Sequence, residues 1–114
     1  MNFNEYQNTI KQFDTFANQS NNLTDPSFIS KILGLSGETG EVAEKFKKIY
    51  RDKNGQISIE DKTEIAKELG DVLWYLATIS RYLDIPFENI ATQNIEKLSD
   101  RQKRNQIHGS GDNR

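Results

Sequence analysis

The sequence predicts an all-α protein, and three observations support this class. Apolar residues recur at intervals of three and four positions along most of the chain, which is the spacing of one helical face. Alternating β-branched segments bounded by turns, which would indicate strands, are nearly absent. The connections between the expected helices are short, so we predict an antiparallel four-helix bundle.

The first two helices are predicted from their apolar faces and their caps. The first is expected to begin near Phe3, with Asn4 as candidate cap, and to run to about Ser20. A polar break follows. The second helix is expected over Pro26–Tyr50, because proline suits the first turn and Asp25 precedes it as a cap.

Three glycines interrupt this second helix at three-residue intervals: Gly34, Gly37 and Gly40. Each costs on the order of 1 kcal/mol relative to alanine inside a helix. We therefore expect another helix or a ligand to approach the backbone closely here.

The second half of the chain predicts two more helices. Ser58 and Asp61 resemble a capping box, and the apolar stripe that follows them runs to about Asp84. Pro86 then begins a fourth helix, expected to end near Arg104.

Length and composition limit the class of protein. A chain of 114 residues predicts one domain, which we place at residues 1–106, with a polar tail at 107–114. Because only 34% of residues are hydrophobic, the core of one chain would be modest, and oligomerisation is expected to complete it.

Charge and cysteine content exclude several classes of function. A net charge of -2 gives no general attraction to nucleic acid or to an anionic membrane. The absence of cysteine excludes disulfides and thiolate metal sites. The sequence has no signal-peptide pattern and no apolar run long enough to span a membrane, so a cytoplasmic protein is expected.

Two acidic pairs are the main candidates for function: Glu38 with Glu41, and Glu68 with Asp71. Residues three apart on a helix are neighbours, so each pair projects from one face. On a helical wheel both pairs lie at the same edge of their apolar stripes, whereas Glu44 points towards solvent. The four carboxylates are therefore expected to form one site.

Such carboxylates would repel one another unless a cation joined them. Ligand sets made only of oxygen favour hard cations, Mg²⁺ or Mn²⁺, over zinc. The alternative is that the acids form ordinary salt bridges with Lys45, Lys48 or Lys67.

The segments around these acids resemble a known family. Residues 33–44, LGLSGETGEVAE, and residues 68–75, ELGDVLWY, are similar to the two motifs of MazG-like nucleoside triphosphate pyrophosphohydrolases. This all-α superfamily also includes dimeric dUTPases and a phosphohydrolase of histidine biosynthesis. Its signature is E-x-x-E followed by E-x-x-D, and the resemblance covers nearly the whole chain.

The resemblance implies an activity, a cofactor and an assembly. Hydrolysis between the α and β phosphates would yield a nucleoside monophosphate and pyrophosphate. Glu38, Glu41, Glu68 and Asp71 would hold Mg²⁺, with Mn²⁺ as a substitute. Helical hairpins of this family pair with a neighbouring subunit, so a homodimer is expected, with a tetramer as the alternative.

Phosphate contacts are expected from the fourth helix. Lys97, Arg101 and Arg104 lie on one side of it, and Lys97 and Arg101 match the family's phosphate-binding Lys and Arg. Asn94, one turn earlier, is also within reach of a ligand. The alternative is a solvated basic helix end, which the helix dipole favours.

Gln7 and Arg114 are two further candidates for ligand contact, and each also has a purely structural explanation. Gln7 lies where family members often contact the base, but a solvated surface position explains it as well. Arg114 either closes over the site with its neighbours in the tail or belongs to a frayed terminus.

Three functions remain open on the sequence. The first is a Mg²⁺-dependent pyrophosphohydrolase that maintains or regulates the nucleotide pool. The second keeps the fold but acts on dUTP or on a phosphoribosyl nucleotide. The third is a non-catalytic helical module that binds metal and a partner.

Overall fold

The computed structural model describes all residues from 1 to 114, and every regular element in it is helical. The predicted all-α class is thus confirmed. The elements are α1 (Phe3–Ile10), the short 3₁₀ helix η1 (Lys11–Phe13), α2 (Pro26–Asp52), α3 (Ile59–Tyr82) and α4 (Phe87–Lys103). No helix combines the length and the hydropathy needed to cross a bilayer.

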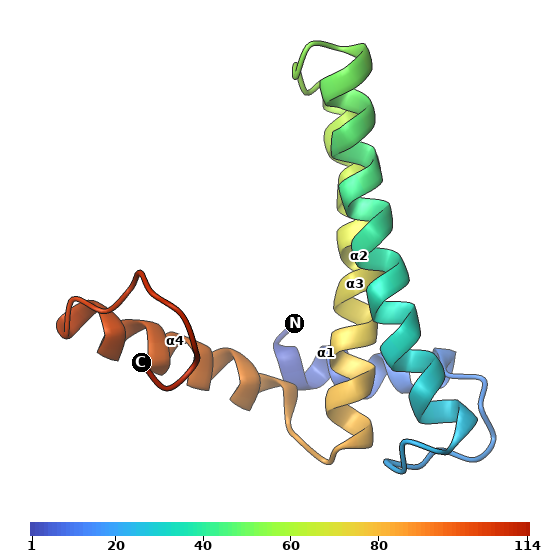
Figure 1. Cartoon of the computed structure of the whole chain (residues 1–114). Coiled ribbons are helices and arrows are strands. Elements are labelled where there is room, and N and C mark those ends of the chain that lie inside the picture. Colours follow the sequence, from blue (N-terminus) through green and yellow to red (C-terminus); the bar gives the residue numbers. More distant parts are fainter.

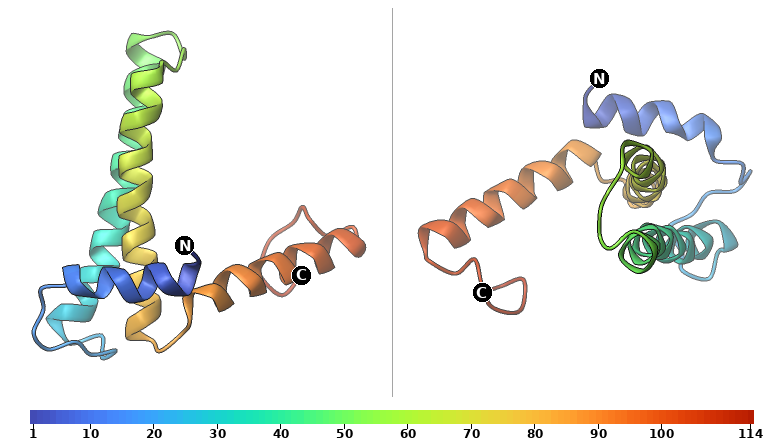
Figure 2. Two further views of the ribbon diagram at one scale, coloured as in Figure 1. Left: turned by 180° about the vertical axis from the view of Figure 1, so that it is seen from behind. Right: turned by 90° about the horizontal axis from the view of Figure 1, so that it is seen from above.

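An antiparallel hairpin of α2 and α3 dominates the molecule (Figure 1). The helix α1 crosses the base of this hairpin, and α4 runs away from it towards one side (Figure 2). The four helices therefore do not close into a compact bundle within one chain.

The predicted caps of α2 and α3 are confirmed. The Asp25 carboxylate accepts a hydrogen bond of 2.9 Å from the backbone N–H of Ser27, with Pro26 in the first turn. Ser58 and Asp61 form the reciprocal capping box that begins α3. The expectation for α1 was wrong by two residues, because Asn2 rather than Asn4 caps it.

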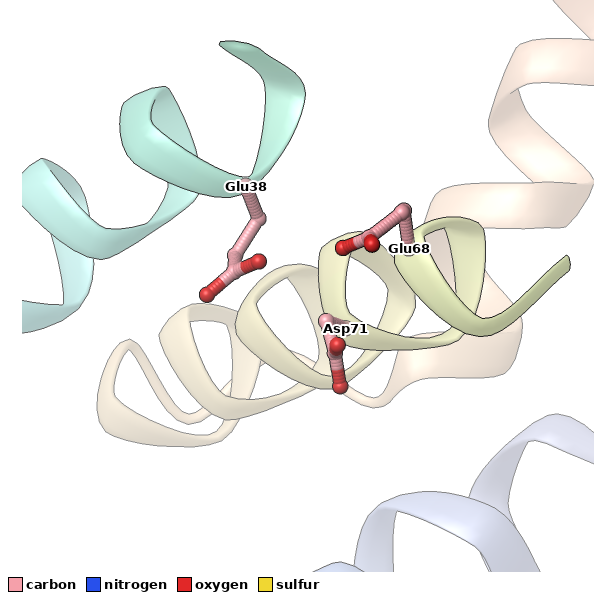
Figure 3. A group of neighbouring side chains, drawn as sticks. All are labelled: Glu38, Glu68 and Asp71. Atoms are coloured by element: carbon pink, nitrogen blue, oxygen red, sulfur yellow. The ribbon is translucent and has the colours of Figure 1, made fainter. Parts of the chain in front are cut away.

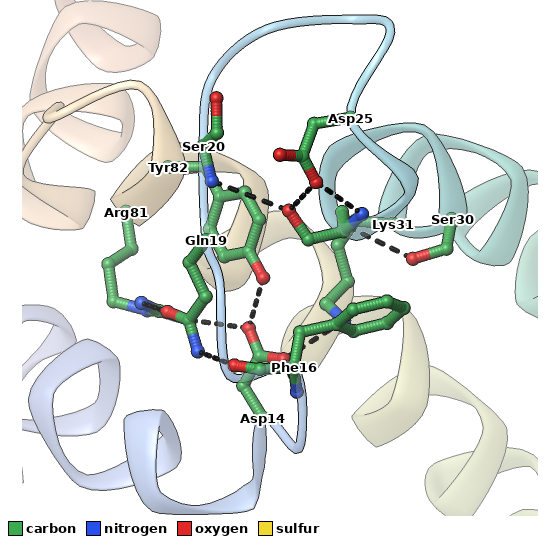
Figure 4. Close-up of polar contacts among 10 residues, drawn as sticks. Asp14, Phe16, Gln19, Ser20, Asp25, Ser30, Lys31, Arg81 and Tyr82 are labelled. Carbon is green, nitrogen blue, oxygen red and sulfur yellow. Dashed lines mark hydrogen bonds and ion pairs between the residues drawn. The ribbon is translucent and has the colours of Figure 1, made fainter.

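The first helix is shorter than predicted, because the chain turns away at Asp14 to form a buried polar cluster (Figure 4). The fully buried Asp14 carboxylate lies 3.1 Å from Lys31 Nζ and 2.7 Å from Arg81 Nη2. Burial alone would raise the pKa of Asp14, but hydrogen bonds from Tyr82 and Lys31 lower it. Burial and the hydrogen bond to Asp14 raise the pKa of Tyr82 to about 12.

This cluster determines where the first helix ends. Apolar spacing continues through Phe13 and Ala17, but a helix there would carry Asp14 away from its two cations. Leaving those charges buried and unpaired would cost several kcal/mol, on the order of 3–5. The cluster instead ties the loop at residues 14–25 to the base of the hairpin.

A small apolar core lies where α1, α3 and the start of α4 meet. Ile10, Ala77 and Phe87 are its buried members, and Tyr6, Leu73 and Trp74 pack around them. The rings of Phe3 and Phe87 also form an edge-to-face contact, with their centroids 5.3 Å apart.

Much apolar surface stays exposed outside this core. The accessible surface is 8205 Å², whereas a compact monomer of this mass exposes about 6,400 Å². The radius of gyration is 17.0 Å, against about 13 Å for a compact domain of this length. Leu69 and Ile95, on the apolar faces of α3 and α4, are 52% and 65% exposed. Their apolar stripes have no partner within one chain.

Candidate active site

Three of the four predicted acids converge between α2 and α3 (Figure 3). Glu38 projects from α2 towards Glu68 and Asp71 on α3, and one oxygen from each lies within 4.8 Å of the other two. Glu38 and Glu68 are half-buried and Asp71 is exposed, so the group opens to solvent on one side. The two helices thus bring residues thirty positions apart into one cluster.

Glu41, the fourth predicted acid, lies outside this group. It is exposed one turn beyond Glu38, close enough for its charge to affect that residue. Glu44 is engaged elsewhere, as expected, since it pairs with Lys47 at 2.7 Å and with Lys48 at 3.8 Å. The structure therefore brings together three acids and leaves a fourth alongside them.

The cluster is electrostatically unfavourable without a cation. Partial burial, followed by the charges of Asp71, Glu68 and Glu41, raises the pKa of Glu38 above its ordinary value. Only Glu68 has a basic partner in the group, Lys45, whose Nζ lies 3.2 Å from Glu68 Oε1. The alternative of ordinary salt bridges therefore applies to one acid of the three.

These residues fit a divalent cation. Their donor atoms are all carboxylate oxygens, the type that Mg²⁺ and Mn²⁺ prefer. Three carboxylates and an open side also leave coordination positions for water and phosphate oxygens. The cluster can thus hold a hard metal ion and a phosphorylated ligand together.

The glycines of α2 have different surroundings. A Cβ on Gly34 would collide with the ring of Tyr75, so this glycine allows α3 to approach closely, as predicted. A Cβ on Gly37 or Gly40 would meet nothing within 4 Å. These two positions are open in the single chain.

The predicted phosphate-binding cations lie on α4 and share one anion. Lys97 Nζ and Arg101 Nη2 each lie 3.1 Å from the same oxygen of Asp112. Arg101 is only 4% exposed, and its Nη2 also donates to the Asp112 carbonyl at 2.6 Å. The tail thus folds back over α4 and is not frayed. The helix that carries both cations, α4, runs away from the hairpin that carries the acids (Figure 1).

Of the other predicted phosphate contacts, Asn94 is exposed to solvent, whereas Arg104 and Arg114 are bonded to protein groups. Asn94 is exposed on α4. Arg104 forms a salt bridge of 2.7 Å with Asp100, and its Nη2 also donates to the carbonyl of Arg114. Arg114 itself donates to the carbonyls of residues 106, 107 and 111, so it holds the tail together.

Gln7 is buried, and its amide is bonded to protein groups. Its side-chain N–H group donates to Ser80 Oγ at 3.2 Å and to the Ile85 carbonyl at 3.0 Å. Its carbonyl oxygen accepts from the backbone N–H of Phe87 at 3.2 Å. Because its amide is occupied by protein, Gln7 joins α1 to the α3–α4 connection. This arrangement gives no support to the predicted base contact.

Two neighbours of the predicted contacts also prove relevant. Tyr6, next to Gln7 in the predicted base contact, lies near the acids, since burial and then the charge of Asp71 raise the pKa of its hydroxyl. Asp112, one of the tail residues expected to act with Arg114, binds the two α4 cations. Sequence reasoning gave no role to Glu88, one oxygen of which is buried without a hydrogen-bond partner.

Comparisons with known proteins identify the family of this chain. Residues 27–105 match the MazG nucleotide pyrophosphohydrolase domain, a stretch that includes all three clustered acids. The Gene 37 protein of Mycobacterium phage L5 is 48% identical over 82 residues, which cover 72% of each chain. No solved structure matches the chain. The chain belongs to the MazG nucleotide pyrophosphohydrolase family.

Proposed function

We propose that this chain is a Mg²⁺-dependent enzyme that hydrolyses ribo- or deoxyribonucleoside triphosphates between the α and β phosphates. The products would be a nucleoside monophosphate and pyrophosphate, in housekeeping or regulation of the nucleotide pool. The supporting observation is the convergence of Glu38, Glu68 and Asp71 from two helices of a MazG domain.

The roles of the acids follow from their positions. Glu38, Glu68 and Asp71 would hold the ion, and Glu41 is placed to join them when a triphosphate is bound. A bound Mg²⁺ would neutralise charge on the phosphates and lower the pKa of a bound water, and Mn²⁺ is the expected substitute. The partly buried position of Glu38 and Glu68 strengthens these electrostatic effects relative to bulk water.

Lys97 and Arg101 are proposed to bind the remaining phosphate oxygens. Their joint contact with Asp112 supports this, because it demonstrates that both cations can reach one anionic oxygen. A triphosphate would compete with Asp112 for them. Asn94 on the same helix and Arg104, the residue that caps its C-terminal end, are secondary candidates.

We also propose that the active assembly is a homodimer. The protein exposes roughly 1,800 Å² more surface than a compact monomer of its mass, an area sufficient for a stable subunit interface. The exposed apolar stripes of α3 and α4 would be covered by a second copy. Because α4 leaves its own hairpin, a second copy would also be needed to bring Lys97 and Arg101 to the acids (Figure 2).

A substrate panel tests this function. Purified protein is incubated with canonical and damaged nucleoside triphosphates, dUTP, dUDP and a phosphoribosyl nucleotide, with Mg²⁺ or with EDTA. We expect equal amounts of pyrophosphate and monophosphate from triphosphates, and no product with EDTA. Turnover restricted to dUTP and dUDP, or to the phosphoribosyl nucleotide, would contradict the proposed substrate class. Metal binding without any turnover would favour a non-catalytic interaction module.

A further inference from the structure

Lys45 is the basic partner of the carboxylate cluster. Its Nζ lies 3.2 Å from Glu68 Oε1. On α2 it follows Glu38 by seven residues, or about two helical turns, so both side chains project towards α3. Because the two helices run antiparallel, Lys45 meets Glu68 from the side of the hairpin tip. Glu68 therefore lies between an ammonium group and the other two carboxylates of the cluster.

The ammonium group of Lys45 competes with a metal ion for Glu68. The Lys45 side chain is 31% exposed and that of Glu68 is 19% exposed, so both are partly withdrawn from solvent. Water therefore screens their attraction less than it would screen a pair on the open surface. A divalent cation held by Glu68 would be repelled by an ammonium group on the same carboxylate. Binding of the ion thus favours the departure of Lys45.

A second acceptor for Lys45 lies one turn away on α3. Glu64 Oε2 is 3.8 Å from Lys45 Nζ, while the other Glu64 oxygen pairs with Lys67 at 2.6 Å. Lys45 and Glu64 also line one cavity of about 190 Å³ on the tip side of the cluster. An ammonium group is about the size of a water molecule, whose share of liquid volume is about 30 Å³. Lys45 therefore has room to turn from Glu68 to Glu64.

We propose that Lys45 is a positioning residue for the metal site, which holds Glu68 in the metal-free protein and moves to Glu64 when a divalent cation binds. This inference rests on the proposed function, because it takes from it a metal ion bound at the three acids. Without metal, the ammonium charge offsets part of the repulsion among the carboxylates. The exchange frees Glu68 for coordination and moves a positive charge away from the ion. Lys45 thereby sets the affinity of the site for metal.

The test measures Mn²⁺ binding from the electron paramagnetic resonance signal of the free ion. Lys45→Met removes the competing charge and keeps an apolar stem, so Kd for Mn²⁺ should fall about threefold to tenfold. A purely structural role predicts the opposite sign, since a poorly held Glu68 would weaken binding. Lys48→Met is the matched control, because Lys48 lies on the same helix and pairs with Glu44 outside the cluster. It should bind Mn²⁺ within about twofold of wild type, because its exposed charge is screened.

A second variant tests the exchange itself. Glu64→Gln removes the charge of the second acceptor, so Lys45 should stay on Glu68 and Kd for Mn²⁺ should rise about twofold to fivefold. In the Lys45→Met background the same change should alter Kd by less than about 1.5-fold, because no ammonium group remains to be transferred. An equal effect of Glu64→Gln in both backgrounds would overturn the exchange, since Glu64 would then act only through its own charge.

The outcomes separate this inference from the proposed function. If Lys45→Met keeps native helicity by circular dichroism and binds Mn²⁺ no more tightly than wild type, the role of Lys45 is overturned and nucleotide hydrolysis stands. Metal binding that responds to Lys45, without turnover of any nucleotide, would overturn only the proposed hydrolysis. Wild-type protein that binds neither Mn²⁺ nor Mg²⁺ would overturn both.

A measurement on wild-type protein decides the question if Lys45→Met does not fold. In NMR spectra of the lysine ammonium groups, added Mg²⁺ should shift the resonance of Lys45 in step with saturation of the site. The resonance of Lys48 should stay in place, because its partner Glu44 lies outside the cluster. An unchanged Lys45 resonance at saturating Mg²⁺ would overturn the inference.

Discussion

Glu38 occupies a position where its charge is unfavourable in the metal-free protein. Partial burial and three neighbouring carboxylates raise the pKa of this group, so the folded state binds a proton more tightly than the unfolded chain. Its contribution to stability is therefore greatest at low pH and is lost as the pH rises through its folded pKa. A divalent cation would remove the same repulsion at neutral pH.

The first prediction concerns this residue. Glu38→Gln should raise the Tm of the metal-free protein at pH 7 by about 2–4 °C, which corresponds to about 0.5 kcal/mol of relieved like-charge repulsion. The gain should disappear below about pH 4, where Glu38 itself is protonated. Thermal unfolding at both pH values with EDTA measures this.

Added Mg²⁺ provides the control for that measurement. It should raise the Tm of the wild-type protein and have little effect on Glu38→Gln. A variant that is less stable than wild type at pH 7 without metal would contradict the unfavourable charge that we assign to Glu38.

At the scale of elements, the local signals in the sequence predicted the helices well. The caps at Asp25 and Ser58 lie where they were expected, because a cap depends on residues within three positions of it. The end of α1 was not predictable in this way. It depends on the ion pair of Asp14 with Lys31 and Arg81, which joins distant parts of the chain.

The second prediction concerns the tip of the hairpin. The hydrogen bond from Lys53 and that from the Ser58 backbone lower the pKa of Asp61 from its ordinary 3.8 to about 2. The stabilising contribution of Asp61 is therefore present above about pH 4 and is lost as the pH falls towards 2. Asp61→Asn should be less stable than wild type at pH 6, and the difference should shrink between pH 4 and pH 2.

Denaturant unfolding of both proteins across this pH range measures that difference. Asp100→Asn is a comparison at an exposed acid that is not an N-cap residue and pairs with Arg104, the C-cap of α4, whose hydrogen bond also lowers the pKa of Asp100. A difference between wild type and Asp61→Asn that stays constant down to pH 2 would contradict the assigned shift in pKa.

The third prediction compares two glycines of α2. Alanine at Gly37 meets no atoms, so Gly37→Ala should stabilise the protein by up to about 1 kcal/mol through helix propensity. Alanine at Gly34 collides with the Tyr75 ring, which must move away. We expect Gly34→Ala to be less stable than Gly37→Ala by about 1–3 kcal/mol. Equal stability in urea unfolding would show that Gly34 provides no clearance for α3.

At the scale of the whole molecule, the sequence predicted less. Periodicity identified the apolar faces of α3 and α4, and composition indicated a modest core, but neither determines which surface covers a given stripe. Leu69 and Ile95 lie on these faces and stay exposed, because one chain does not cover them. The sequence predicted the neighbours of the acids better than those of the apolar stripes. The acids occupy matching positions on two helices that pair with each other, and this brings them together. Glu41 was predicted to join the other acids but lies one turn beyond Glu38. A helical wheel gives the direction of a residue around the helix axis, but not where its side-chain carboxylate lies.

The fourth prediction concerns assembly. Sedimentation velocity should give a dimer for the wild-type protein, and Leu69→Glu should shift it towards monomer, because a charge would be buried in the proposed interface. Ile59→Glu adds the same charge at a position 79% exposed in the first turn of α3, and it should remain dimeric. A monomeric wild-type protein at micromolar concentration would contradict the proposed dimer.

The assignment of the carboxylate cluster as the active site is tested most directly by two variants, Asp71→Asn and Glu44→Gln. For each variant and for wild type, the rate of pyrophosphate release is measured with a nucleoside triphosphate that the wild-type protein hydrolyses, at saturating Mg²⁺. Both changes remove one acidic charge from the α2–α3 hairpin, but Asp71 belongs to the cluster and Glu44 pairs with lysines outside it. We predict that Asp71→Asn lowers kcat by at least about a hundredfold with helicity intact, as expected for the loss of several kcal/mol of charge stabilisation. Glu44→Gln should stay within about twofold of wild type. Near-wild-type turnover by Asp71→Asn would contradict the assignment of these carboxylates as the active site.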